Sequence, residues 1–147
     1  MKREKKKQIM SAIILLVFSG SILTYAIMFA FPEEEKEGVW KVGLLIYIYG
    51  EPIQIPAGIG VFNETKSKLY TLSNDNIIYK KGSEEATLGE FFKIWGKEFN
   101  RTCILDYCNN ENHSMRMYVR KNGKWVENFD YDSYVLKNGD VILIDYR

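Results

Sequence analysis

The sequence has few of the side chains on which catalysis and metal binding usually depend. Its 147 residues include one histidine, two cysteines and three prolines. The histidine, His113, stands in a polar stretch with no nucleophile motif around it, and one imidazole does not make a metal site. The acids Asp130, Asp132 and Asp140 occur among turn formers, where aspartate is expected anyway. We therefore predict that the protein is not an enzyme and that it holds no metal or cofactor.

An excess of charge of one sign is also missing. The chain has 20 basic and 19 acidic residues, and residues 38–147 contain 14 of each. Proteins that bind nucleic acid carry a broad basic footprint, so we do not expect nucleic acid as a partner. Basic residues cluster only at 2–7, where membrane topology and anionic lipid headgroups account for them.

The chain does contain a long uncharged run, residues 9–31. At about 1.5 Å rise per residue, a helix of this length crosses a hydrocarbon core of about 30 Å. Five basic residues precede the run and the acidic segment 33–37 follows it, so the positive-inside rule keeps the N-terminus in the cytoplasm. We predict a cytoplasmic basic tail at 1–8, a transmembrane helix at 9–31, a linker at 32–38 and an extracytoplasmic domain at 39–147. The protein would then be a single-pass protein of the cell membrane.

A cleaved signal peptide is the main alternative, because Thr24-Tyr25-Ala26 is similar to a small-residue cleavage site. However, the apolar region of a signal peptide spans about 7–15 residues, and the run at 9–31 is longer. A buried helix of a soluble protein is less favoured still, because the run has no polar stripe at helical spacing. The length of the run favours an uncleaved signal anchor.

Cys103 and Cys108 fall in the outer domain, where disulfides persist. Their spacing fits neither a zinc pair nor a thioredoxin-like site. A straight strand would hold their Cα atoms about 16 Å apart, beyond the limit of about 7 Å, so a bridge requires residues 104–107 to turn. We favour a disulfide over two buried thiols or a redox function.

Three N-x-S/T sequons agree with an extracytoplasmic location in an organism that glycosylates: Asn63, Asn100 and Asn112.

The outer domain alternates strand patterns with turn formers. Residues 38–49 and 141–146 are apolar on both faces and are predicted to be central strands. A turn is predicted at 50–52, a hairpin at 66–81, a short strand at 103–105 and a strand at 115–119. Asn122-Gly123 is a strong hairpin signal, and residues 128–134 are predicted to form a loop.

One main helix is predicted to begin at Thr87. Thr87 and Glu90 form a capping-box pattern, in which each side chain satisfies a backbone N–H of the other residue. Large apolar residues then recur at helical spacing and give one aromatic face, which we expect to cover a sheet: Leu88, Phe91, Phe92, Trp95 and Phe99.

This order of elements resembles the β-grasp, or ubiquitin-like, arrangement, and residues 134–144 are similar to its closing strand. The resemblance implies an α+β domain in which the first and last strands lie parallel at the centre of a mixed sheet, with one main helix on one face. The expected fold is therefore a single N-terminal transmembrane helix followed by a β-grasp-like domain.

Residues 46–60, which contain IPAGIG, and 87–96, which contain LGxFFxIWG, resemble a family of uncharacterised, membrane-anchored extracytoplasmic proteins of archaea and bacteria. Members of that family carry several histidines that look like metal ligands. The corresponding positions here hold other residues, so the resemblance implies no metal site in this chain: Lys41, Gly43, Tyr70, Leu72 and Tyr79.

These observations favour an anchored interaction module, which acts as an accessory subunit of a membrane protein complex. Its partners would be the lipid bilayer and another membrane protein. Trp40, Tyr131 and Tyr134 are candidate contact residues, because aromatic side chains often anchor interfaces. The alternative is a domain that binds a small ligand or a cation near the irregular segment 56–61, and an enzyme is less favoured.

Overall fold

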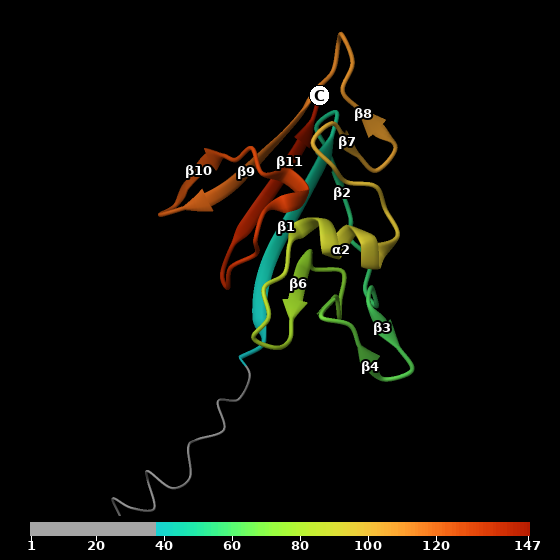
Figure 1. Ribbon diagram of the computed structural model, residues 1–147. Helices are drawn as coiled ribbons and strands as arrows, with labels where there is room; N and C mark the ends of the chain where they lie inside the picture. Colours follow the sequence, from blue (N-terminus) through green and yellow to red (C-terminus); the bar gives the residue numbers. More distant parts are fainter. Residues whose placement is uncertain (1–37) are drawn as a thin grey trace, which may run out of the picture. The chain divides into compact units, whose positions relative to one another are not determined.

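The computed structural model describes residues 38–147, which fold into an α+β domain with one α-helix on a mixed sheet (Figure 1). The predicted fold class is confirmed at this level. The tail and span predicted at 1–8 and 9–31 lie outside the described residues, as does most of the linker at 32–38. Within the described part of the chain, no helix is both long and apolar enough to cross a membrane.

The main sheet has the strand order β10-β9-β11-β1-β6-β5, and β2 also pairs with β1. Strands β1 (Trp40–Ile48) and β11 (Val141–Tyr146) are parallel neighbours at its centre, so both central strands were predicted correctly. The remaining strands of this sheet are antiparallel to their neighbours: β2 (Glu51–Ile53), β5 (Leu69–Tyr70), β6 (Ile77–Lys80), β9 (Met115–Lys121) and β10 (Lys124–Glu127).

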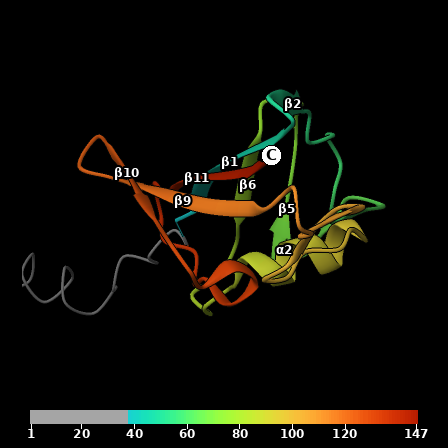
Figure 2. The same ribbon diagram turned by 90° about the horizontal axis from the view of Figure 1, so that it is seen from above.

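The core lies on one side of this sheet, under helix α2 (Leu88–Trp95). Alternate residues of β1, β11 and β9 point into it, because successive side chains of a strand face opposite sides. Figure 2 shows α2 on one side of the sheet and, for the part of the chain that the structure describes, no helix on the other. The buried residues of these three strands are Val42, Leu44, Ile46, Ile48, Ile142, Ile144, Tyr146, Met115, Met117 and Val119.

The helix begins where the capping box predicts. The Glu90 N–H donates to Thr87 Oγ1 at 3.3 Å and the Thr87 N–H donates to Glu90 Oε2 at 2.8 Å. It ends at Trp95, because Gly96 adopts a left-handed conformation with φ 76°. The prediction that Phe99 belongs to the helical face was wrong, since Phe99 lies beyond the helix end. Its side chain is buried nonetheless, with its ring centroid 4.6 Å from that of Phe92.

Two hairpin turns have the chemistry that the sequence indicated. Asn122 and Gly123 join β9 to β10 with φ values of 51° and 76°, as a type I′ turn requires. The turn between β1 and β2 lies one residue earlier than predicted, at Tyr49 and Gly50, because Ile48 already pairs with Glu51. Residues 128–134 contain a short 3₁₀ helix, η1 (Tyr131–Ser133), within the predicted loop.

The predicted disulfide between Cys103 and Cys108 is confirmed. Residues 104–107 turn as the bridge requires, and strands β7 (Cys103–Ile104) and β8 (Tyr107–Cys108) form a small hairpin in which the two Cα atoms lie 4.0 Å apart. A second small hairpin joins β3 (Val61–Phe62) to β4 (Thr65–Lys66).

Candidate functional site

Among residues 38–147, no helix lies over the side of the sheet opposite α2, and we call this side the open face. Its side chains come from the alternate positions that do not enter the core, and they stand in rows across the strands. One row runs from Tyr47 through Asp145 to Arg116, and the next runs from Leu45 through Leu143 and Tyr118 to Glu127. Leucines and tyrosines of these rows are half-buried although no described element packs over them, so the open face presents apolar surface as well as charge.

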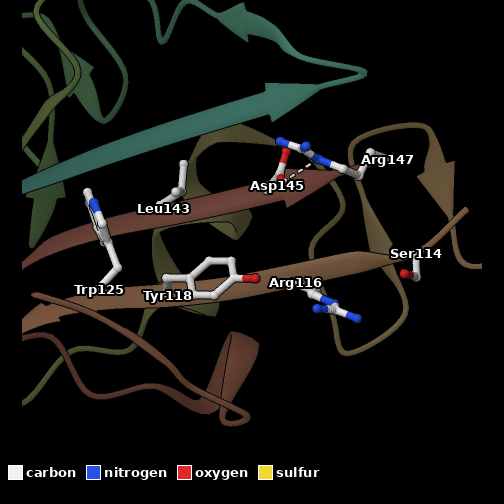
Figure 3. A pocket seen from close by; sticks show the side chains of 7 residues that line it. All are labelled: Ser114, Arg116, Tyr118, Trp125, Leu143, Asp145 and Arg147. Carbon is white, nitrogen blue, oxygen red and sulfur yellow. Dashed lines mark ion pairs between the residues drawn. The ribbon is translucent and has the colours of Figure 1, made fainter.

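A groove of about 570 Å³ runs along β9, β10 and β11 on this face. Figure 3 shows the side chains of these strands around it, with Trp125 and Tyr118 near one end and Arg116, Asp145 and Arg147 near the other. It is lined by Ser114, Arg116, Tyr118, Trp125, Leu143, Asp145 and Arg147.

Two arginines and one aspartate line the second end of the groove. Arg147 Nε lies 2.8 Å from Asp145 Oδ2, and the Arg147 side chain is 73% exposed. Arg116 is the cross-strand neighbour of Asp145 but forms no ion pair with a described residue. Asp145 Oδ1 is buried and accepts no hydrogen bond from the described residues. This end of the groove therefore carries a local excess of positive charge.

The other end of the groove is aromatic. Trp125 is 44% exposed, and Tyr118 lies in the neighbouring strand β9. The Tyr118 phenol and then the charge of Glu127 raise the pKa of Arg116 above its ordinary value. The groove thus combines tryptophan, tyrosine and arginine side chains, which protein interfaces favour, with one leucine.

The three contact residues predicted from the sequence do not form one exposed surface. Tyr134 is only 5% exposed, so the prediction that it offers a surface contact was wrong. Its hydroxyl donates to Asp140 Oδ2 at 2.8 Å, which makes it part of the core boundary. Tyr131 is half-buried near Phe99, and Trp40 is half-buried with Lys80 Nζ 4.3 Å from its ring centroid.

The predicted sequons differ in accessibility. Asn63 lies in the turn between β3 and β4 and is exposed, and Asn112 is exposed as well. Asn100 is half-buried, and its Oδ1 accepts from the backbone N–H groups of Thr102 and Cys103 at 2.9 and 2.8 Å. The Asn100 side chain therefore helps to hold the disulfide hairpin, whereas the other two asparagines are free for modification.

The segment 56–61, proposed as an alternative ligand site, is occupied by its own packing. The Thr71 hydroxyl donates to the Pro56 carbonyl at 2.7 Å and accepts from the Ile59 N–H at 3.1 Å. A Cβ atom on Gly60 would lie 2.4 Å from the Leu69 carbonyl oxygen, so the glycine permits a close backbone approach. Among residues 38–147, no three His, Cys, Asp or Glu side chains are grouped so as to hold a metal ion.

His113, the one histidine, belongs to an aromatic cluster that the sequence did not indicate. Its ring centroid lies 5.0 Å from that of Tyr49, which also contacts Tyr107 and Tyr146 in edge-to-face geometry. The Tyr146 hydroxyl donates to the Cys108 carbonyl at 2.7 Å. The cluster therefore ties the β1–β2 turn, the disulfide hairpin and β11 together, and we assign it a structural role.

The residues of the open face were missed because their position depends on the order of the strands. The alternation of Arg116, Tyr118 and Arg120 predicted a strand with a wet face, but it did not show which strands lie beside it. Asp145 and Trp125 join that face only through pairing of β9 with β11 and β10.

Comparison of the chain with protein family models, curated proteins and solved structures found no match.

Proposed function

We propose that the protein is a single-pass, membrane-anchored extracytoplasmic interaction module, and that it is an accessory subunit of a membrane protein complex. The observation that carries the proposal is the open face, where no other part of the described chain covers the half-buried apolar residues and the arginines. A groove that combines exposed aromatic and arginine side chains is typical of a surface that a protein partner covers.

Two further features support a membrane-anchored, extracytoplasmic domain. The uncharged run at 9–31 has the length and flanking charges of a signal anchor, and the disulfide is the kind of bond that persists outside the cytoplasm. We further propose that the domain is β-grasp-like. The parallel pairing of β1 with β11, with the β9–β10 hairpin beside them and one helix on one face, supports this assignment.

Co-purification of the full-length chain in mild detergent tests the function. We expect a membrane protein to copurify in stoichiometric amount. Replacing Arg116 and Tyr118 together by alanine should remove it, because this pair supplies positive charge at one end of the groove and aromatic surface at the other. Arg116 is exposed and Tyr118 half-buried on an uncovered face, so we expect the variant to fold.

A matched double variant controls for general effects of lost surface. Phe62 is 68% exposed and Lys66 is exposed in the β3–β4 hairpin, so Phe62→Ala with Lys66→Ala also removes one aromatic and one cation. We expect this variant to retain the partner. Recovery of the wild-type chain without any partner, or equal loss from both double variants, would refute binding through the open face.

A further inference from the structure

Strand β10 forms one outer edge of the main sheet. It is the last strand in the order of the sheet, and among the residues that the structure describes it pairs only with β9. All four of its residues are exposed. At the opposite end of the sheet, both residues of β5 are buried, so the two edges differ.

The backbone groups that face outward from β10 follow from its pairing with β9. Lys124 pairs with Lys121 next to the two-residue turn, and the Asn128 N–H donates to the Met117 carbonyl at 2.9 Å. Hydrogen-bonded pairs alternate with non-bonded pairs in an antiparallel ladder. Lys124, Val126 and Asn128 therefore bond to β9, whereas the N–H and C=O groups of Trp125 and Glu127 point away from the sheet.

Apolar side chains accompany this unpaired backbone. Trp125 is 44% exposed, Val126 is 47% exposed and Phe129, two residues beyond the strand, is 66% exposed. Edge strands are usually protected by charge or cover, and here only the strand ends, Lys124 and Glu127, are charged. The centre of the edge, Trp125 and Val126, can therefore pair with another strand.

We propose that β10 pairs in antiparallel orientation with β10 of a second copy of this chain, about a two-fold axis that passes beside Val126. In this register Trp125 lies opposite the second copy's Glu127, and the reverse pair forms by symmetry. Each pair joins two residues whose backbone groups point outward, so both pairs form hydrogen bonds. The dimer extends the sheet across both copies and buries Val126 against its counterpart.

The sequence of the strand favours this register over its neighbours. Centring the axis on Glu127 would place like charges directly opposite each other. Centring it on Trp125 would pair Glu127 with Gly123, which lies in the turn with φ 76° and is not in strand conformation. A shift of the pairing by one residue would place the open face of one copy on the same side as the core face of the other copy.

Charge complementarity also favours a second copy. Arg120 is the cross-strand neighbour of Trp125 on β9. The second copy's Glu127 would stand on the same face two strands away, about 10 Å between Cα atoms, which two long side chains can span. Dimerisation therefore brings Glu127 of each copy within reach of Arg120 of the other copy.

A disulfide trap at Val126 tests the pairing. Both native cysteines of the chain are bonded to each other, so Val126→Cys introduces the single free thiol. The two Val126 residues form a non-bonded pair with Cα atoms about 4.5 Å apart, which suits a disulfide. The full-length variant in detergent should form a covalent dimer on mild oxidation.

Trp125→Cys and Glu127→Cys are matched controls in the same exposed strand. In the proposed register residue 125 lies opposite residue 127 of the second copy, so the two cysteines of either control variant do not face each other. We therefore expect each control to cross-link about tenfold more slowly than Val126→Cys. Equal rates at all three positions would overturn the proposal, and so would fastest cross-linking at Trp125→Cys, which would indicate a different register.

A backbone variant gives an independent measurement. The Glu127 N–H points outward, so Glu127→Pro removes a bond across the dimer without removing one to β9. Native mass spectrometry should find two copies of the chain in each wild-type assembly and one copy in each assembly of Glu127→Pro. A monomeric wild type, or a strand of another protein captured at Val126→Cys in place of a second copy, would refute the dimer. Arg116 and Tyr118 are untouched in these variants, so the result is separate from that of the open-face test.

Discussion

Reduction of the Cys103–Cys108 disulfide is expected to lower the free energy of unfolding by about 2 kcal/mol. The bridge closes a loop with a sequence separation of five, and the loop-closure entropy of so short a loop corresponds to about 2 kcal/mol at 25 °C. A longer loop would give more, because the entropy rises with the logarithm of loop length. The expected cost is therefore at the lower end of the range for native disulfides.

The domain should remain folded after reduction, because hydrogen bonds also close the hairpin. Asn100 Oδ1 accepts from the N–H groups of Thr102 and Cys103, and the Asn109 N–H donates to the Thr102 carbonyl at 2.7 Å. The Tyr146 hydroxyl additionally holds the Cys108 carbonyl at 2.7 Å. These contacts do not depend on the bond between the sulfurs.

Urea unfolding followed by tryptophan fluorescence, with and without reductant, measures the effect. With a slope of about 2 kcal/mol per molar urea, the midpoint should fall by about 1 M in reductant. A variant with Cys103→Ala and Cys108→Ala is the control, and its midpoint should not respond to reductant. An unchanged wild-type midpoint would refute the entropic reasoning. A loss above about 4 kcal/mol would also refute it, because short-loop closure cannot supply that much.

Three further substitutions test the local structure. Gly60→Ala should cost about 2–3 kcal/mol in urea unfolding, because φ is +72° and the new Cβ would lie 2.4 Å from the Leu69 carbonyl oxygen. Gly58→Ala, with φ +82° and open space around the Cβ, should cost about 1 kcal/mol. Thr87→Ala should cost about 1 kcal/mol by removing the helix cap, which calorimetry can measure. Burial raises the pKa of Tyr134, so the stability from its neutral hydroxyl is complete below about pH 10 and is lost as pH rises towards the raised pKa. Tyr134→Phe should flatten that alkaline loss in unfolding measured across pH.

The elements that the sequence predicted well are those determined by local chemistry. Thr87 and Glu90 satisfy each other's backbone groups within one helical turn. Asn122 and Gly123 tolerate the positive φ of their turn without help from the rest of the fold. The disulfide required only that the four intervening residues turn. None of these predictions depended on knowing which strands are neighbours.

The errors arose where tertiary packing decides the position of a side chain. Phe99 continues the helical spacing of the aromatic face, but Gly96 ends the helix before it. Tyr134 is predicted to be a contact residue because aromatic side chains often anchor interfaces, yet packing and a hydrogen bond to Asp140 hold it inside. The groove escaped prediction for a similar reason, since Arg116 and Asp145 are distant in sequence and meet only through strand pairing.

Trp125 belongs both to the open face and to the sheet edge formed by β10. It therefore connects the proposed partner binding with the proposed dimer. The Trp125 side chain lines the groove, while its backbone groups face the edge. Antiparallel pairing about an axis perpendicular to the sheet keeps the two open faces on the same side, so a dimer would present two grooves side by side. The partner would bind side chains of β9 and β10 on the open face, whereas dimerisation would use the outward backbone groups of β10. A partner with two matching sites would then bind a dimer more tightly than a monomer, without any new contact.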